Sequence, residues 1–417
     1  MLKKIDVKQL RIGMYIHELD SSWLDTPFWQ KSFRLEDKAT LSTVWKTGIR
    51  HAWIDTGKGL DVLTAADAAP IPSATEATPT VPALPASSII PPRLEAVSLR
   101  EELGRAAKIV NKSRDAVFSM FNEARLGRAV DVKDALPLVE EITASVIRNQ
   151  DALIGLARLK SKDDYTYMHS VAVCALMVAL ARQLRLDEQQ TRDAGLAGLL
   201  HDIGKMAISS SILGKRGKLT ESEYKSVKGH PEAGHKILLE GHGVCQAALD
   251  VCLHHHEKMD GSGYPHGLAG EQISLYARMG AVCDVYDAIT SDRPYKQGWC
   301  PADSLRKMAE WSKNQHFDER VFQAFVKSIG IYPIGTLVRL ESGRLGVVVE
   351  QQVGKSLLLP KVRVFFSSKA QTYIVPELLD LASAGVQDRI VAREDIAKWG
   401  LKDINRFWLG EAAAPMQ

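Results

Sequence analysis

The sequence predicts a mainly α-helical protein, in which a large helical domain lies between a small α/β module and a small β-rich appendage. Three observations lead to this fold class. Apolar residues recur at helical spacing from about residue 93 to 330, the period changes to two from about 331, and a proline-rich stretch separates the first 65 residues from the rest. We therefore expect four segments: a module at 1–65, a linker at 66–92, a helical domain at 93–330 and an appendage at 331–417.

The N-terminal module is expected to contain two short strands, at 14–17 and 51–54, with a helix at 35–47 between them. This order predicts a βαβ-like arrangement. His17 and His51 stand apart from other residues that carry chemistry. The module therefore shows no catalytic pattern. The linker that follows holds seven of the seventeen prolines, and its other residues are mostly Ala, Ser and Thr, which gives it little to bury.

The helical domain and the appendage differ in the spacing of their apolar residues. Two helices are predicted from stripes at steps of three and four, formed by Leu99, Leu103, Ala107 and Val110 and by Val139, Ile142, Val146, Ile147 and Leu153. In the appendage, 337–340, a turn at Ser342 and Gly343, and 345–349 predict a β-hairpin, and 362–365 predicts another strand.

Composition excludes several classes of protein. A net charge of +3 is too small to indicate a nucleic-acid polymer as partner. Five cysteines without a C-x-x-C pair favour a reducing compartment over a disulfide framework. The N-terminus has no apolar signal segment, and the longest apolar run, 171–181, is shorter than the roughly 20 residues that a membrane span needs. We therefore expect a cytoplasmic protein without a membrane span.

Histidines are concentrated in the helical domain, where nine of the twelve lie between residues 169 and 266. Together with two aspartates, some of them form the series His169, His201-Asp202, His230, His255-His256 and Asp284. Neutral imidazole and carboxylate are the ligands that hold Zn, Fe or Mn. Two such ions close together are a common device for cleaving phosphate esters.

The spacing within this series suits a shared centre. One carboxylate at Asp202 can reach two ions, because it has two acceptor oxygens. Lys205, one turn after His201, would place an ammonium group where it could hold a phosphate. Consecutive histidines on a regular helix diverge, so His255 and His256 can join one cluster only near a helix end.

The segment 260–265, Asp-Gly-Ser-Gly-Tyr-Pro, supplies that helix end. Gly261 and Gly263 also allow backbone to approach a bulky ligand closely.

Four motifs together resemble a known family. HDIGK at 201–205, HHEKMDGSGYP at 255–265, DVYDA at 284–288 and RPYK at 293–296 resemble the HD-GYP subgroup of the HD phosphohydrolase superfamily. The resemblance covers about 160–330. Members of this subgroup are cyclic di-GMP phosphodiesterases of bacterial signalling. The N-terminal module resembles, more weakly, an uncharacterised module that often precedes such domains.

The resemblance implies a binuclear metal centre and a substrate site. The implied ligands are His169, His201, Asp202 and Asp284 for one ion, and Asp202, His230, His255 and His256 for the other. The implied phosphate contacts are Lys205, Arg293 and Lys296, and the implied substrate loop contains Gly261, Gly263, Tyr264 and Pro265. Tyr165 stands where some members carry a third-metal glutamate, so we expect two divalent ions. Fe or Mn is favoured, and the ligands also permit Zn or Ni.

The function expected from this resemblance is two-metal hydrolysis of cyclic di-GMP, with Asp202 and Lys205 as catalytic residues. The product would be pGpG, and a second cleavage would give GMP. Three alternatives stay open: an HD hydrolase of another nucleotide, a non-catalytic cyclic di-GMP sensor, and a scaffold that uses the N-terminal module to dock partners. The glycine-tyrosine-proline loop is a second candidate surface for protein partners. The sequence does not give the oligomeric state.

Three further residues have expected roles at the edge of this site. His254 is expected to be an extra histidine and not a ligand, and His235 is expected to be structural. Glu257 is expected to fix the tautomer of a histidine ligand.

Overall fold

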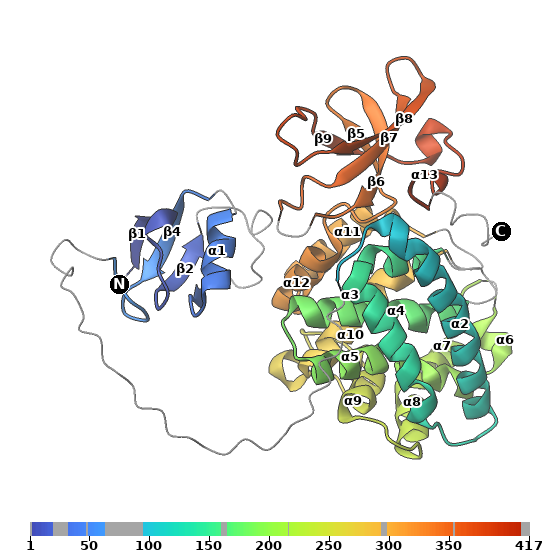
Figure 1. Cartoon of the computed structure of the whole chain (residues 1–417). Coiled ribbons are helices and arrows are strands. Elements are labelled where there is room, and N and C mark those ends of the chain that lie inside the picture. The colour runs from blue at the N-terminus through green and yellow to red at the C-terminus, as the bar shows by residue number, and fades with distance from the viewer. Residues whose placement is uncertain are drawn as a thin grey trace, which may run out of the picture. The chain divides into compact units, whose positions relative to one another are not determined.

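The computed structural model describes residues 2–19, 32–46, 49–62, 95–159, 165–215, 217–292, 298–352 and 355–409. The chain forms two compact units, Met1–Glu95 and Ala96–Gln417 (Figure 1). Each unit has its own secondary structure and is described by itself. The predicted linker at 66–92 lies outside the described residues.

The N-terminal unit is a small antiparallel sheet with one helix. Its elements are β1 (Leu2–Asp6), β2 (Tyr15–Leu19), β3 (Phe33–Arg34), α1 (Lys38–Lys46) and β4 (His51–Asp55). The strand order is β1-β4-β2-β3, and every neighbouring pair is antiparallel. The predicted βαβ-like arrangement is therefore wrong. Its two strands and its helix exist, but β2 and β4 pair antiparallel, and β1 occupies the other side of β4.

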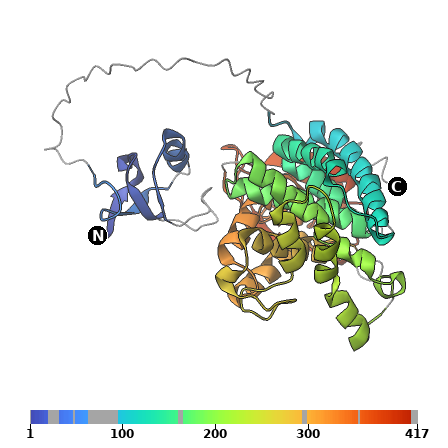
Figure 2. The same ribbon diagram turned by 90° about the horizontal axis from the view of Figure 1, so that it is seen from below.

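The first part of the larger unit is helical, as predicted. Its helices are α2 (Leu99–Arg125), α3 (Leu136–Arg158), α4 (Tyr165–Gln183), α5 (Glu188–Leu200), α6 (Ser210–Leu213), α7 (Glu221–Lys228), α8 (His230–Leu239), α9 (Gln246–His254), α10 (Leu275–Thr290), α11 (Pro301–Lys313) and α12 (Glu319–Ile329). The central helix α4 packs against α2, α3, α5, α10 and α12 (Figure 2). This position explains why α4 is apolar all round.

Helix α4 is also the one described helix that is long and apolar enough to cross a membrane. However, 78% of its most apolar window is buried inside the protein. Such burial is that of a core helix, because a spanning helix presents its apolar surface to lipid. The described part of the chain thus offers no clear membrane span.

The C-terminal part is a five-stranded antiparallel sheet with the order β8-β7-β6-β5-β9. Its elements are β5 (Leu337–Leu340), β6 (Arg344–Glu350), β7 (Lys361–Ser367), β8 (Thr372–Asp380), β9 (Ile390–Arg393) and a short helix, α13 (Arg406–Leu409). The predicted hairpin is confirmed as β5 and β6, and the next predicted strand as β7. The two edge strands, β8 and β9, were not predicted.

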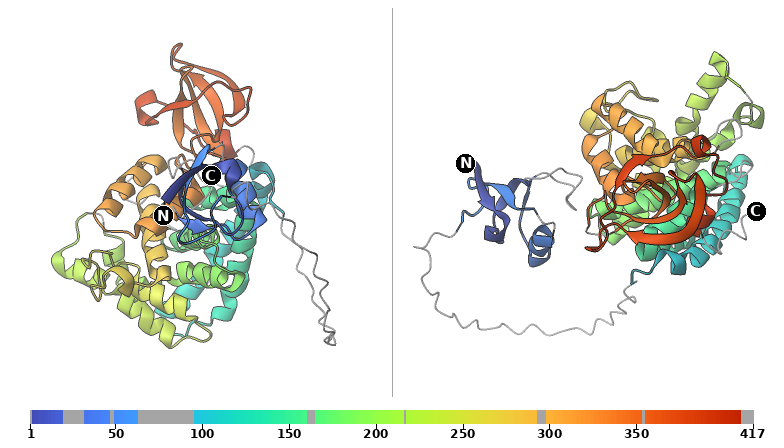
Figure 3. Two further views of the ribbon diagram at one scale, coloured as in Figure 1. Left: turned by 90° about the vertical axis from the view of Figure 1, so that its left-hand side faces the viewer. Right: turned by 90° about the horizontal axis from the view of Figure 1, so that it is seen from above.

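This sheet packs on the helical part within the same unit (Figure 3). Arg393 of β9 donates a hydrogen bond of 2.9 Å to the carbonyl of Ala302 and pairs with Asp303, both in α11. The backbone N–H of Gln351 donates to the carboxylate of Asp151 in α3 at 3.2 Å. The β-rich appendage and the helical domain therefore share one compact body.

Candidate metal centre

Five segments of the helical part bring the predicted metal ligands together. His169 lies in α4, and Asp284 lies in α10. The pair His201-Asp202 directly follows α5, at the turn into a short 3₁₀ segment, Ile203–Ala207. His230 is the first residue of α8, and His255-His256 directly follows α9. The expectation that His255 and His256 lie at a helix end is thus confirmed.

A close approach between α8 and the turn after α5 makes this convergence possible. A Cβ atom on Gly204 would lie 1.9 Å from the carbonyl oxygen of His230, so no larger residue fits there. His230 is 1% exposed and Asp202 is also 1% exposed. The glycine of HDIGK therefore allows the two segments that carry these predicted ligands to pack against each other.

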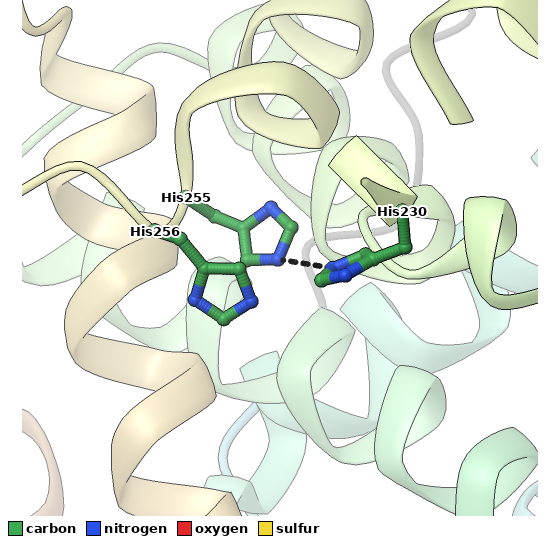
Figure 4. Close-up of side chains that lie close together, drawn as sticks. All are labelled: His230, His255 and His256. Atoms are coloured by element: carbon green, nitrogen blue, oxygen red, sulfur yellow. Dashed lines mark hydrogen bonds between the residues drawn. The ribbon is translucent and has the colours of Figure 1, made fainter. Parts of the chain in front are cut away.

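The donor atoms form two groups. His169, His201 and Asp202 make one group, and His230, His255 and His256 make the other, and the donor atoms within each group lie within 4.8 Å of one another. In Figure 4 the imidazoles of His255 and His256 lie beside each other and face the imidazole of His230. Nε2 of His230 lies 3.3 Å from Nε2 of His255. Asp284 joins the first group, because its Oδ1 lies 2.9 Å from Nε2 of His169.

The carboxylate of Asp202 lies between the two groups. Its Oδ2 is 3.5 Å from Nε2 of His169 and 3.4 Å from Nε2 of His201. Its Oδ1 is 3.3 Å from Nε2 of His230 and 3.9 Å from Nε2 of His255. Each oxygen thus faces a different set of histidines, which is the geometry that a bridging carboxylate requires.

Backbone carbonyls fix which ring nitrogen of three histidines is free. Nδ1 of His201 lies 2.8 Å from the carbonyl of Gly198, and Nδ1 of His230 lies 2.7 Å from the carbonyl of Val227. Nδ1 of His255 lies 2.9 Å from the carbonyl of Val251 in the same way. A carbonyl can only accept, so each Nδ1 carries the hydrogen and donates it. The Nε2 lone pairs then point to the centre, where a metal ligand needs them.

Burial and charge also favour a cation at the centre. Burial lowers the pKa of His255 well below its usual value and that of His256 to about 4, so both imidazoles are neutral at pH 7. For His201, burial opposes protonation, but the carboxylates of Asp202 and Asp284 outweigh it and raise the pKa to about 10. Two buried carboxylates therefore demand compensating positive charge, which bound metal ions would supply.

Two buried polar atoms that lack hydrogen-bond partners indicate whether a metal ion fits this site. Nε2 of His201 and Oδ1 of Asp202 are buried and have no hydrogen-bond partner among the described residues. Buried polar atoms without partners are costly unless they coordinate something. Both atoms point into the same cluster of imidazoles and carboxylates. The residues present therefore fit divalent metal ions.

The loop that follows His256 lies against the centre. The ring of Tyr264 stacks on that of His256, with the ring centroids 4.7 Å apart. Gly263 must be glycine, because a Cβ there would lie 2.4 Å from Cα of Glu257, and Gly261 adopts a φ of +78°. Pro265 follows in the same loop.

Glu257 has a different role from the expected one. Its carboxylate accepts hydrogen bonds from the backbone N–H groups of His266 at 2.7 Å and Leu268 at 3.1 Å. It therefore holds the loop and does not orient a histidine ligand. The expected histidine partner of Glu257 is wrong, because the groups that its carboxylate binds are backbone N–H groups nine and eleven residues further along the chain.

The predicted phosphate contacts are only partly described. Lys205 pairs with Oδ2 of Asp202, so in this structure its ammonium group is engaged by a ligand carboxylate. Arg293 and Lys296 lie outside the described residues. His254 points away from both ligand groups, with Nδ1 2.8 Å from Asp250 and Nε2 3.2 Å from His266.

Asp287 belongs to the motif DVYDA at 284–288, and the sequence predicts no role for it. Its Oδ2 accepts a hydrogen bond of 2.6 Å from Nδ1 of His169, and its Oδ1 accepts one from the hydroxyl of Ser291. Asp287 is 3% exposed and lies one helical turn after Asp284. The spacing of Asp284 and Asp287 was the available signal, since residues three apart on a helix share a face.

Comparison with known proteins gives a consistent result. A model of the HD domain matches residues 145–321, and a domain of unknown function (DUF3391) matches residues 2–135. The cyclic di-GMP phosphodiesterase response regulator RpfG of Xanthomonas campestris pv. campestris is 38% identical over 199 residues, which cover 46% of this chain and 52% of that protein. The 3'3'-cGAMP-specific phosphodiesterase 3 of Vibrio cholerae is 35% identical over 173 residues, covering 42% of this chain and 37% of that protein.

A further relative matches almost the whole chain. The cyclic di-GMP phosphodiesterase PA4108 of Pseudomonas aeruginosa is 54% identical over 413 residues. The match covers 99% of this chain and 97% of that protein, so it includes the N-terminal unit, the helical part and the C-terminal sheet. The HD phosphohydrolase resemblance of the sequence motifs is thereby confirmed. The chain belongs to the family of HD-domain cyclic di-GMP phosphodiesterases.

Proposed function

We propose that this protein is a cyclic di-GMP phosphodiesterase that uses two divalent metal ions. The position of Asp202 carries this proposal, because its two carboxylate oxygens face two different groups of histidines. His169, His201 and Asp284 would complete one ion's ligands, and His230, His255 and His256 would complete the other's. The name of the relative PA4108 supports the choice of substrate.

The chemistry follows from what the residues can do. When bound, the ions would lower the pKa of water and neutralise charge that develops on the phosphate. His169, His201, His230 and His255 would hold them in a fixed orientation, since Nδ1 of each imidazole is bound by a backbone carbonyl or by Asp287. Lys205 would exchange its contact with Asp202 for the phosphate of the substrate, and Arg293 and Lys296 would add further positive charge.

The substrate is tested by a panel of nucleotides. We expect protein purified without oxygen and loaded with Mn or Fe to convert cyclic di-GMP to pGpG, with GMP appearing later. 3'3'-cGAMP belongs in the panel as a competitor, because the relative named for that specificity is 35% identical over 173 residues. A preference for 3'3'-cGAMP, cyclic AMP or a deoxynucleoside triphosphate would contradict the proposed substrate.

A substitution tests the metal centre itself. Asp202→Ala should lower kcat for cyclic di-GMP by at least about 100-fold, since it removes the bridging ligand of both ions. Metal analysis should show fewer ions per chain than in the wild type. Asp115→Ala, at an exposed carboxylate of α2, is the matched control and should change neither value. Binding of cyclic di-GMP without turnover by metal-replete wild type would favour a sensor instead.

Two further expectations belong to this proposal. The five cysteines are all free thiols, which supports a reducing cytoplasmic location. Protein partners would dock through the loop at 260–265 or through the N-terminal unit.

A further inference from the structure

One lysine beside the candidate metal centre has no role in the site predicted from the sequence. Lys228 is the last residue of α7 and lies two residues before the ligand His230. Its Nζ is 5.3 Å from the ring centroid of Tyr224 and 4.8 Å from that of Tyr264. The ammonium group thus contacts two aromatic rings, one in α7 and one in the loop that follows α9.

The charge of Lys228 is not neutralised by a carboxylate of the described residues. Its neighbours differ in this respect, because Lys205 pairs with Asp202 and Lys215 pairs with Glu223. The first turn of α7 holds two carboxylates, Glu223 and Glu221. Among the described residues, Glu221 forms no ion pair with Lys228. A positive charge is therefore available for an anion next to the centre.

The two tyrosines connect this lysine to the centre on one side and to solvent on the other. Tyr264 stacks on the ligand His256 with centroids 4.7 Å apart, so Lys228 lies one aromatic ring away from a metal ligand. Tyr224 is 54% exposed, so part of its ring can be contacted from the solvent. Figure 2 shows the segment with α6 and α7, in yellow-green, projecting from the edge of the helical bundle.

A cyclic dinucleotide has groups that suit these side chains. It carries two phosphodiesters and two bases, and only one phosphodiester can occupy the metal centre during a cleavage. The other phosphate would need a cation, and a base would gain from an exposed aromatic ring on which to stack.

We propose that Lys228 and Tyr224 form a second substrate subsite, in which Lys228 binds the phosphate that is not being cleaved and Tyr224 stacks with a base. This inference rests on the proposed function, since it takes a cyclic dinucleotide as the substrate. It makes α7 a determinant of specificity, because a small phosphodiester has no second phosphate to place there.

The test compares two substrates. Bis(p-nitrophenyl) phosphate contains one phosphodiester, whereas cyclic di-GMP contains two. In Lys228→Gln, the ratio of kcat/KM for cyclic di-GMP to that for bis(p-nitrophenyl) phosphate should fall about tenfold, mainly through a higher KM. Lys225→Gln, which removes the same charge from an exposed position on the same helix, should keep the wild-type ratio.

A purely structural lysine would behave differently. If Lys228 only braced Tyr264 and its loop, Lys228→Gln would impair both substrates equally and leave the ratio unchanged, which would overturn the inference. For the stacking partner, Tyr224→Phe should keep the ratio, and Tyr224→Ala should lower it about fivefold or more. Equal ratios in these two variants would refute the role of Tyr224.

Binding separates this inference from the proposed function. The Kd for cyclic di-GMP, measured by calorimetry on the metal-loaded protein, does not depend on turnover. If the wild type binds cyclic di-GMP without hydrolysing it, the proposed function is wrong. The subsite is then supported if Lys228→Gln weakens Kd about tenfold relative to Lys225→Gln, and refuted if the two variants bind equally.

Discussion

At the scale of single residues, the contact of 2.6 Å between Asp287 and His169 holds the imidazole of a proposed metal ligand in one orientation. The carboxylate holds Nδ1 of the imidazole and leaves Nε2 directed toward Asp284 and Asp202. Such partners fix the orientation of a ligating histidine and raise its basicity. Asp287 in turn accepts a hydrogen bond from Ser291, so it is itself held in place.

We expect Asp287→Asn to lower the affinity for metal about 10- to 100-fold while leaving the fold intact. The amide keeps the shape of the side chain but loses the negative charge that strengthens the ligand. Metal content after dialysis against a graded series of a weak chelator measures this effect without relying on turnover. The exposed variant Asp115→Asn is the control, and equal metal retention in the two variants would contradict a positioning role for Asp287.

The candidate site could be predicted from sequence only as far as residue types and local spacing reach. His201 and Asp202 are adjacent in the sequence, as are His255 and His256, and both pairs directly follow a helix, so the closeness of the two residues within each pair is a local property. The partnership of His169 with Asp287 spans 118 residues, and no local pattern specifies it. The role of Glu257 failed for a similar reason, since its backbone partners depend on how the loop after α9 folds back.

At the scale of elements, a buried ion pair joins α2 to α3. Glu102 of α2 is fully buried and accepts hydrogen bonds of 2.7 Å from the guanidinium of Arg148 and 2.8 Å from the hydroxyl of Ser145. Burial favours the neutral acid, but these donors outweigh it and keep the pKa of Glu102 below its usual 4.5. The pair therefore stabilises the helix contact when Glu102 is charged.

We expect Glu102→Gln to lower the free energy of unfolding by about 3 kcal/mol at pH 7, because Arg148 would lose its buried counter-charge. A carboxyl with a lowered folded pKa contributes stability above its unfolded pKa, and this contribution is lost as the pH falls through the folded value. The difference between the wild type and the variant should thus shrink below about pH 4.5. Urea unfolding followed by helical circular dichroism at several pH values measures it.

The control uses the other arginine on the same carboxylate. Arg105 is 57% exposed and contacts Glu102 at 3.3 Å, so Arg105→Gln should cost less than about 1 kcal/mol at pH 7. An effect of Glu102→Gln that stayed constant with falling pH would show that shape, and not charge, makes this contact stable.

Elements with a regular burial pattern were predictable, and the others were not. Helices and strands that bury one face leave a period in the sequence, and those that are buried on both faces, such as α4 and β6, leave a continuous apolar run. Strand β8 is an edge strand that contains Pro376 and is exposed along most of its length, so it has no such period. The direction of pairing in the N-terminal sheet was also out of reach, because alternation identifies strands without giving their neighbours.

At the scale of the whole molecule, the two compact units have separate cores. The N-terminal core is formed by residues of Met1–Glu95 alone, among them Met14, Ile16 and Ile54, which are not exposed. All the proposed metal ligands lie in the other unit, Ala96–Gln417. A bound ion stabilises only the unit that holds it.

We therefore expect calorimetry of the full chain to show two unfolding transitions, one for each unit. A chelator should lower the midpoint temperature of only the transition that belongs to the larger unit. Metal present at about 100 times its Kd would contribute about 2.7 kcal/mol to that unit, and stripping it would remove this contribution. Deleting residues 1–65 should abolish the smaller transition and leave kcat for cyclic di-GMP within about twofold of the wild type, since the catalytic unit keeps its whole core. A single transition that the chelator shifts as a whole would instead mean that the two units unfold together, and a large loss of kcat on deletion would assign the N-terminal unit a part in catalysis.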